Sequence, residues 1–547
     1  MLIYFSMSIL ILGSLLFGSP LTTTSVFALE QEEGLLASVR VLTVDEQQEA
    51  LDFILNKTQE SGYSAIGLDL ETEPAVLLMR DSTSVPTSHF AFSFGLNRML
   101  HDLFADAHVR VEVDAILAEA TYATLDLCLS WLHGEEPRII NSCETDFAQV
   151  GDLVTSMGGL TPADIFAMLQ ETIPHEQDFF LLALPQSWLV REDFLSYFGL
   201  LNDDSASVDL ILARDGEEGL KDVSISIPLA LAPTNGTKPL PSFVSFEVQN
   251  ETSTAVFKLD ACIFNAEYMA VLQDFWSTVD ANENVNTVVL DLRENRGGDF
   301  LVATTFLQYI TRDPYTLFDI KQRQSDEFCN QAPALCDPQT IGFLQSLGID
   351  ISNEVYDLPG SASSIFLSQI AGSPSSLDLF NGTLYVLTSG ATFSSAHLFA
   401  GVIKRNNFGT LVGTPTGNTP SFWGNLLRFS VPNTDLIYYL TTSRTELNST
   451  DVNDEDLDAI YPDILVPTKR DDILAGRDAQ LEYVMENNTP NTPTSSPDIS
   501  GAHSTSPPIT PQWKKSKKVK KKKDAKKKKD AKKKKEGKKG KRLLKKT

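Results

Sequence analysis

The sequence lacks the short motifs of two large enzyme classes. It has no G-x-x-x-x-G-K-[ST] segment, which excludes a phosphate-cradling P-loop, and no H-E-x-x-H segment, which excludes a helical zinc peptidase site. Histidine is also scarce, at 7 in 547 residues, so few side chains can serve as a catalytic base. We predict no cofactor and no metal.

Long apolar runs are missing beyond the N-terminus. The run Ile9–Phe17 is too short to cross a bilayer comfortably, and no later segment is long enough. Val26-Phe27-Ala28 follows it, a small-residue pattern typical of signal-peptide cleavage, although no Lys or Arg precedes the run. We therefore predict a signal peptide over residues 1–28 and a soluble protein that is secreted to the extracellular space.

Cysteine is too rare for a disulfide-built scaffold, but five cysteines are compatible with an oxidising compartment. Cys329 and Cys336 lie close together among Asn, Pro and Asp residues, which favours a disulfide within one loop. Cys128 with Cys143 is a second candidate pair. Cys262 follows an apolar strand and is predicted to be a buried thiol.

Basic residues are scarce in most of the chain. From Lys514 onward lie 22 of the 45 Lys and Arg and 3 of the 72 Asp and Glu, which leaves 23 basic and 69 acidic residues in residues 1–513. So acidic a body argues against nucleic-acid binding. Residues 487–547, a Pro/Ser/Thr-rich linker and a Lys-rich tail, are predicted to be disordered. The tail is either a solvated polycation or a binding segment for an anionic polysaccharide, a lipid surface or the acidic body.

Periodicity divides the remaining chain into three regions. Apolar residues at helical spacing dominate residues 29–136, and residues 137–240 mix short strands and helices. Residues 241–486 alternate strand and helix, which predicts βαβ crossovers and a partly parallel sheet. Within this last region, residues 313–376 are predicted to be an irregular insertion.

The middle region resembles a degenerate PDZ-like module. Its Gly151-Asp152 turn and its alternating strand Val208–Gly216 carry the resemblance, with a helical insertion at about Glu176–Phe198 between them. The alternative is an ordinary α+β subdomain.

Two segments of the third region each combine a buried strand, a tight turn and the start of a helix. Val288–Asp299 (VVLDLRENRGGD) ends in Gly297–Gly298, which can bring backbone N–H groups close to a ligand. Leu384–Lys404 places Ser394–Ser395 at a helix N-terminus. A backbone anion site beside a hydroxyl nucleophile is the minimum apparatus for acyl transfer.

These motifs resemble those of the C-terminal processing (tail-specific) proteases and the tricorn protease core. The resemblance extends over roughly residues 250–485. The matching motifs are D-L-R-x-N-x-G-G from Asp291, T-F-S-S-A from Thr392, G-T-P-T-G-N from Gly413 and Y-P-D-I from Tyr461. The resemblance implies an α/β fold with a crotonase-like ββα serine peptidase core. It implies a serine-type endopeptidase that acts on protein or peptide substrates.

The resemblance places the nucleophile at Ser394, with Ser395 as runner-up. His397 stands where the family has an acid. A Ser pair at a helix N-terminus is otherwise explained by helix capping.

The base predicted here is a histidine rather than a lysine. The segment Gly413–Pro420 lacks the Lys of the Ser–Lys branch of the family, whereas Asp106-Ala107-His108 resembles the turn of the His-using branch. Neutral imidazole at His108 suits the abstraction of a serine proton. His397 is the main rival for this role, and a turn held by Asp106 is the structural alternative for His108.

The remaining site residues follow from the same resemblance. Asp456 is the predicted acid that orients the base, with Glu455 next. The oxyanion hole is predicted from the backbone N–H groups of Gly297, Gly298 and Ser395.

Two other functions stay open. The fold also suits a non-catalytic ligand-binding protein, and the missing Lys favours that alternative. A matrix-adhesion protein that binds through its Lys-rich tail is the other.

Overall fold

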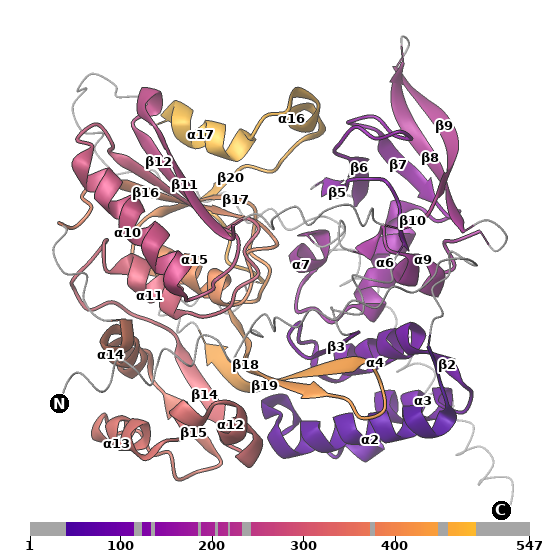
Figure 1. Cartoon of the computed structure of the whole chain (residues 1–547), viewed down its shortest axis with the longest axis horizontal. Coiled ribbons are helices and arrows are strands. Elements are labelled where there is room, and N and C mark those ends of the chain that lie inside the picture. Colours follow the sequence, from indigo (N-terminus) through magenta and orange to yellow (C-terminus); the bar gives the residue numbers. More distant parts are fainter. Residues whose placement is uncertain are drawn as a thin grey trace, which may run out of the picture.

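The computed structural model describes residues 40–113, 123–132, 137–183, 188–202, 206–216, 219–231, 242–371, 378–446 and 458–487. Figure 1 shows three groups of elements around a common centre. The predicted signal peptide and the predicted disordered segment after residue 487 lie outside the described residues.

A six-stranded sheet forms the core of the C-terminal group. Its first pair, β11 and β12, is antiparallel and every other neighbouring pair is parallel, as the strand–helix alternation predicted. In spatial order its strands are β11 (Val244–Gln249), β12 (Thr254–Leu259), β13 (Thr287–Asp291), β16 (Thr383–Thr388), β17 (Thr410–Gly413) and β20 (Ile464–Leu465).

Both faces of this sheet are covered, because successive residues of a strand point to opposite sides. Val288 and Leu290 of β13 pack into the main core, whereas Val289 between them packs with Val484 on the opposite face. The covering helices are α10 (Ala266–Ala281), α11 (Leu301–Leu307) and α15 (Ser395–Arg405) on the first face and α17 (Ala479–Asn487) on the second. A short helix, α16 (Arg470–Ala475), precedes α17.

The N-terminal helices pack on a second sheet that belongs mostly to the C-terminal half. Strand β3 (Arg110–Val113) joins this sheet by pairing with β19, so the turn before β3 is fixed by a strand more than 300 residues later. The helices are α2 (Val44–Ser61), α3 (Pro74–Ser82) and α4 (His89–Phe104), and β1 (Val41–Leu42) pairs with β2 (Thr87–Ser88) beside them. The other strands, in order, are β15 (Val355–Leu358), β14 (Asp319–Arg323), β19 (Leu436–Glu446) and β18 (Ser421–Ser430).

Residues 313–376 are more regular than the sequence predicted. They contribute strands β14 and β15 and the helices α12 (Asp326–Gln331), α13 (Pro338–Ser346) and α14 (Gly360–Ala371). The strands were missed because their order depends on pairing: β14 is held between β15 and β19, and β19 lies more than 100 residues later. A disulfide joins Cys329 of α12 to Cys336.

In the described part of the chain, the middle group is a five-stranded antiparallel sheet that packs with short helices. The sheet begins at Leu129, inside the region that the sequence suggested was helical. Its strands are β5 (Leu129–Leu132), β6 (Arg138–Asn141), β7 (Leu153–Met157), β8 (Ser207–Gly216) and β9 (Gly219–Pro228). The helices are α6 (Pro162–Thr172), α7 (Asp178–Ala183) and α9 (Glu192–Tyr197), and β4 (Ala123–Thr124) pairs with β10 (Ala230–Leu231).

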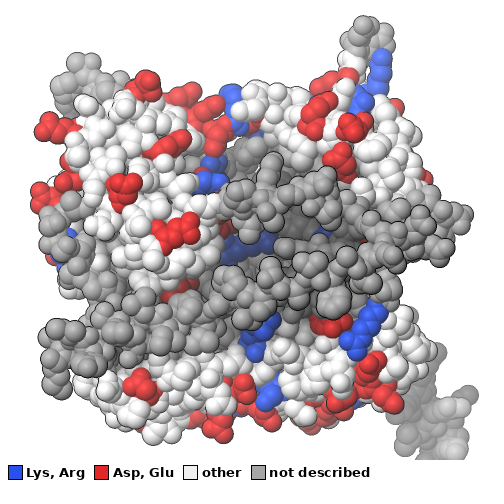
Figure 2. Space-filling model, in the orientation of Figure 1, with Lys and Arg blue, Asp and Glu red and all other residues white. Residues whose placement is uncertain are grey.

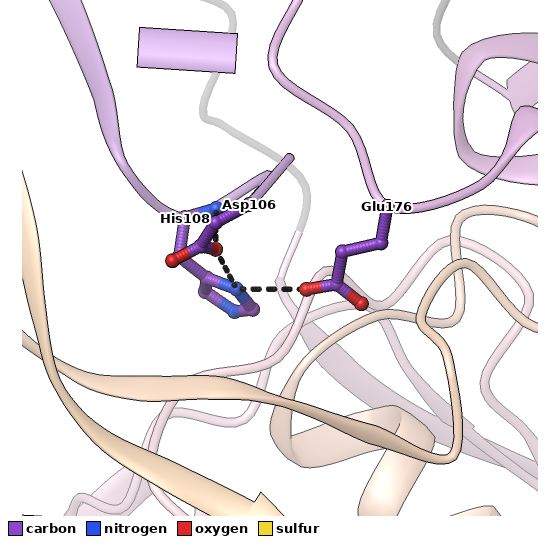
Figure 3. A group of neighbouring side chains, drawn as sticks. All are labelled: Asp106, His108 and Glu176. Carbon is purple, nitrogen blue, oxygen red and sulfur yellow. Dashed lines mark hydrogen bonds and ion pairs between the residues drawn. The ribbon is translucent and has the colours of Figure 1, made fainter. Parts of the chain in front are cut away.

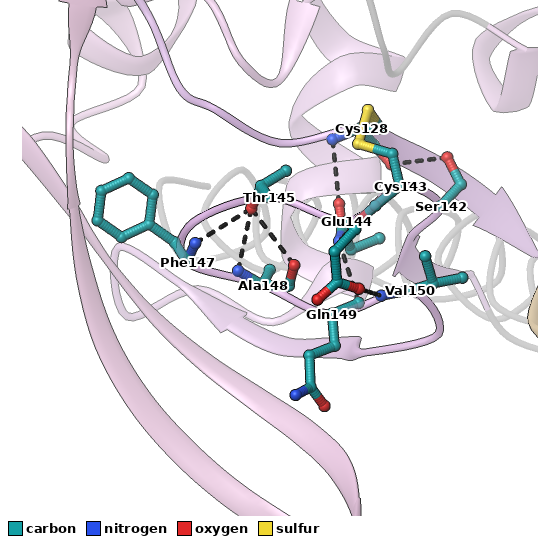
Figure 4. Close-up of a disulfide and its surroundings, with 10 residues drawn as sticks. Cys128, Ser142, Cys143, Glu144, Thr145, Phe147, Ala148, Gln149 and Val150 are labelled. Atoms are coloured by element: carbon teal, nitrogen blue, oxygen red, sulfur yellow. Dashed lines mark hydrogen bonds between the residues drawn. A yellow bond between two sulfur atoms is a disulfide. The ribbon is translucent and has the colours of Figure 1, made fainter.

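A second disulfide fastens the beginning of this sheet (Figure 4). It joins Cys128, just before β5, to Cys143, just after β6. The loop that follows is ordered by its own side chains, because Thr145 Oγ1 accepts the backbone N–H groups of Phe147 and Ala148. Cys262, in contrast, is free and buried, as the sequence predicted.

The surface of the described part carries many acidic side chains. On the face in Figure 2 they are spread over the periphery. No helix in the described ranges is long and apolar enough to cross a bilayer.

Candidate active site

Ser394 lies at a strained turn between strand β16 and helix α15. Its φ of 54° and ψ of −125° are unusual for a residue with a side chain. Its N–H donates to Asn418 Oδ1 at 2.5 Å, and its carbonyl accepts the N–H of Leu398, which starts the helix. Strained backbone of this kind is concentrated at functional sites, because the surrounding contacts must hold it in place.

The glycine turn of the first motif packs directly against Ser394. Gly297 has a φ of +96°, and a Cβ built on it would lie 2.6 Å from Ser394 Cβ and 2.9 Å from Ser395 N. Only glycine allows this approach. The Ser395 hydroxyl donates to Gly298 O at 2.5 Å, so this side chain ties the two motifs together.

Buried Asn295 holds the shape of the glycine turn. Its Oδ1 accepts the Gly297 N–H at 2.8 Å, and its Nδ2 donates to Leu259 O at 2.9 Å. Its carbonyl accepts the N–H of Phe393, the residue before Ser394. Because the Gly297 N–H is already used, the candidate oxyanion donors are the N–H groups of Gly298 and Ser395. Neither makes a hydrogen bond within the described part of the chain.

His108 is positioned by the turn between α4 and β3. Helix α4 ends at Ala105, which is left-handed with a φ of 47°. Asp106 then fixes the turn, because its Oδ1 accepts the His108 N–H at 2.8 Å and its Oδ2 accepts the Thr441 hydroxyl at 2.9 Å. The His108 ring is only 3% exposed and stacks on Phe393 at 4.5 Å between ring centroids. The predicted base therefore contacts the residue adjacent to the predicted nucleophile.

Two carboxylates face the same ring nitrogen of His108 (Figure 3). His108 Nδ1 lies 3.5 Å from Asp106 Oδ1 and 3.9 Å from Glu176 Oε1. Glu176 comes from the loop between α6 and α7. Its other oxygen accepts hydrogen bonds from Asn418 Nδ2 and from Thr419 N and Oγ1. Burial, together with the charge of Asp106, raises the pKa of Glu176 to about 8.

Asn418 connects the Glu176 carboxylate to Ser394. Its Oδ1 accepts the Ser394 N–H, and its Nδ2 donates to Glu176. Asn418 stands in the segment where the sequence showed no Lys, and the structure gives that segment a positioning role instead. Ser394 Oγ and His108 make no direct hydrogen bond, and His108 Nε2 has no hydrogen-bond partner among the described residues.

The rival base His397 is engaged elsewhere. It is fully buried on α15, and its Nδ1 lies 2.8 Å from Thr416 Oγ1. Burial, aided by the nearby His108, lowers the pKa of His397 to about 3. A ring this hard to protonate is a poor proton acceptor in catalysis.

The predicted acids Asp456 and Glu455 lie outside the described residues. Sequence reasoning missed Glu176, Asn295 and Asn418 as parts of the site. Asn295 was visible within the D-L-R-x-N-x-G-G motif. Glu176 stands in no motif, and only the folded chain brings it to His108.

The fold and the site define a mixed α/β protein in which a strained serine and a glycine turn meet at a helix N-terminus. Residues 255–466 match the model of peptidase family S41. No curated protein matches the sequence.

Solved structures share the architecture. Mature CPAF complexed with lactacystin has 16% identity and a TM-score of 0.54, covering 81% of this chain and 98% of that chain. Mature CPAF has 15% identity and a TM-score of 0.52, covering 81% and 97%. A CPAF mutant has 14% identity and a TM-score of 0.55, covering 82% and 100%. At such identities the likeness establishes the fold alone.

Proposed function

We propose that this protein is a serine-type endopeptidase of the His-using rather than the Ser–Lys branch. The observation that carries the proposal is the junction of Ser394, held in a left-handed conformation, with the glycine turn at Gly297 and with Phe393 stacked on His108. An activated hydroxyl beside backbone donors and an imidazole is what acyl transfer requires.

In the proposed reaction, Ser394 Oγ forms a bond to the carbonyl carbon of a peptide while its proton passes to His108 Nε2. The negative charge on the carbonyl oxygen is stabilised by the N–H groups of Gly298 and Ser395, and losing one such donor costs about 2.7–4 kcal/mol. The C–N bond then breaks as His108 protonates the leaving amine. Water then forms a bond to the acyl carbon while its proton passes to His108, and the C–O bond to Ser394 breaks as His108 returns a proton to Oγ.

The orienting carboxylate is proposed to be Glu176 or Asp106, both of which face His108 Nδ1. Asp456, with Glu455 next, stays the competing proposal. Kinetics of Glu176→Gln and Asp456→Asn separate the two, because loss of the orienting acid should lower kcat by about 10⁴. The variant that keeps near-normal kcat identifies the residue that does not orient the base.

We further propose that the C-terminal sheet is a crotonase-like core, that the middle group is PDZ-like and that the protein is secreted. The two disulfides, Cys128–Cys143 and Cys329–Cys336, support the last point, since disulfides persist in oxidising compartments.

Labelling with an activity-based fluorophosphonate tests the central proposal. We expect an adduct on Ser394 in the chain as it stands and in Ser395→Ala, and no adduct in Ser394→Ala or His108→Ala. Folding of each variant is checked by circular dichroism. A folded sample that never reacts would instead support the non-catalytic ligand-binding alternative.

A further inference from the structure

The cluster of Asp106, His108 and Glu176 has buried nitrogen and oxygen atoms that accept no hydrogen bond and could coordinate a metal ion. One ligand atom from each of the three residues lies within 4.8 Å of the others. Glu176 Oε1 and both ring nitrogens of His108 are buried and have no hydrogen-bond partner in the described part of the chain. Buried polar atoms of this kind normally have a partner.

The charge of the cluster is only partly compensated: Arg110 interacts electrostatically with Asp106 but forms no ion pair with it. The hydrogen bonds to the two carboxylates come from neutral donors: the His108 N–H, the Thr441 hydroxyl, Asn418 and Thr419. No Lys or Arg of the described ranges forms an ion pair with Asp106 or Glu176. Two buried acids beside one imidazole favour a divalent cation, because buried charges are normally paired or coordinate metals.

The ligand types and distances suit zinc. One imidazole nitrogen with two carboxylate oxygens is a set that Zn²⁺ accepts, whereas Mg²⁺ and Ca²⁺ prefer oxygen alone. In a tetrahedral zinc complex, neighbouring ligand atoms lie about 3.3–3.5 Å apart. The present separations are 3.5 Å and 3.9 Å from Nδ1 and no more than 4.8 Å between the two carboxylate oxygens, so binding requires the acids to move towards the ion. Glu176 stands on a loop, which can supply that movement.

We propose that Asp106 Oδ1, His108 Nδ1 and Glu176 Oε1 form a Zn²⁺ site, with the fourth position open to water. Zinc on Nδ1 takes the lone pair of that nitrogen, so the proton of the neutral ring must reside on Nε2. Nε2 then has no lone pair with which to accept the Ser394 proton. Bound zinc is therefore a reversible inhibitor of the peptidase. This inhibition rests on the proposed function, whereas the metal site does not.

Calorimetric titration of the chelator-treated full-length protein with ZnCl₂ tests the site itself. We expect one Zn²⁺ per chain, with affinity weakened roughly tenfold or more in Glu176→Gln and in Asp106→Asn. Visible absorption of Co²⁺ in the same site reports the coordination independently of activity. Glu192→Gln is the matched control, because Glu192 is a buried carboxylate of α9 that accepts a backbone N–H and lies outside the cluster.

Equal zinc affinity in the unsubstituted chain, in Glu176→Gln and in Asp106→Asn would overturn the site, because the ion would then be held by other groups. If zinc inhibits the peptidase as proposed, saturating Zn²⁺ should abolish fluorophosphonate labelling of Ser394, and EDTA should restore it. Labelling that persists when the site is saturated with Zn²⁺ would overturn the proposed inhibition. A chelated protein that is never labelled would reject the peptidase proposal, while the calorimetry still decides whether the metal site exists.

Discussion

At the scale of single residues, the site depends on one close approach that only glycine permits. The Gly297 backbone lies against Ser394, and its N–H is held by Asn295. Any added carbon must push the turn away from the nucleophile. The Gly298 N–H next to it, a proposed oxyanion donor, would then be displaced.

We expect Gly297→Ala to slow fluorophosphonate acylation of Ser394 by roughly 100-fold, comparable to the loss of one oxyanion donor. Gly348→Ala is the matched control: Gly348 also has a positive φ, of +83°, but nothing lies within 4 Å of a Cβ there. It should lower stability by about 1 kcal/mol without affecting the rate. An unchanged acylation rate in Gly297→Ala would contradict the assigned role of the turn.

His397 should make the protein acid-sensitive. Its folded pKa of about 3 lies below the ordinary value of 6.5, so between these values the unfolded chain binds a proton that the folded chain does not. The stabilisation is complete above pH 6.5 and is lost as pH falls toward 3, with a slope of at most about 1.4 kcal/mol per pH unit.

The measurement is the drop in Tm between neutral and mildly acidic buffer. His397→Asn keeps a hydrogen-bond acceptor near the position of Nδ1 but cannot take up the proton, so its Tm should fall less on acidification. If both proteins lose the same number of degrees, another group is responsible.

At the scale of elements, local patterns predicted those pieces whose structure is decided locally. Strand β13 and the start of helix α15 are confirmed, because apolar runs and tight turns mark them in the sequence. Strands β14 and β15 were missed, since distant pairing creates them. The same distinction applies to the residues of the site. Sequence motifs predicted Ser394 and His108, whereas Glu176 stands in no motif and reaches the site only through the fold of the loop between α6 and α7.

The Cys128–Cys143 disulfide should stabilise the middle sheet. A closed loop of this length, with a sequence separation of 15, contributes about 3 kcal/mol by limiting the unfolded chain. The double substitution of both cysteines by alanine should lower the free energy of unfolding by that order, as measured by urea denaturation. The corresponding change at Cys329 and Cys336, with a separation of 7, should cost less. The opposite ranking would contradict an entropic origin.

At the scale of the whole molecule, charge is the dominant feature. Residues 1–513 hold 69 acidic and 23 basic residues, and acidic side chains are scattered over the face in Figure 2. Many of these charges lack a basic neighbour and repel one another through solvent. Part of the folding energy is therefore offset by self-repulsion.

Raising NaCl from low to physiological concentration should raise Tm, because the screening length falls from about 30 Å to about 8 Å. Differential scanning calorimetry at several salt concentrations measures this, with sucrose at matched osmolality as the control for effects other than screening. A Tm that falls with added salt would mean that attractive ion pairs outweigh the repulsion.

The pairing of β3 with β19 also sets the order of events during biosynthesis. The turn that carries His108 is secured by strand Leu436–Glu446, and Asp106 is held by Thr441 within that strand. A growing polypeptide therefore cannot complete the turn at Asp106 and His108 until the ribosome has made more than 440 of the 547 amino acids. On the proposed function, a nascent chain would therefore have no peptidase activity until this strand had been made.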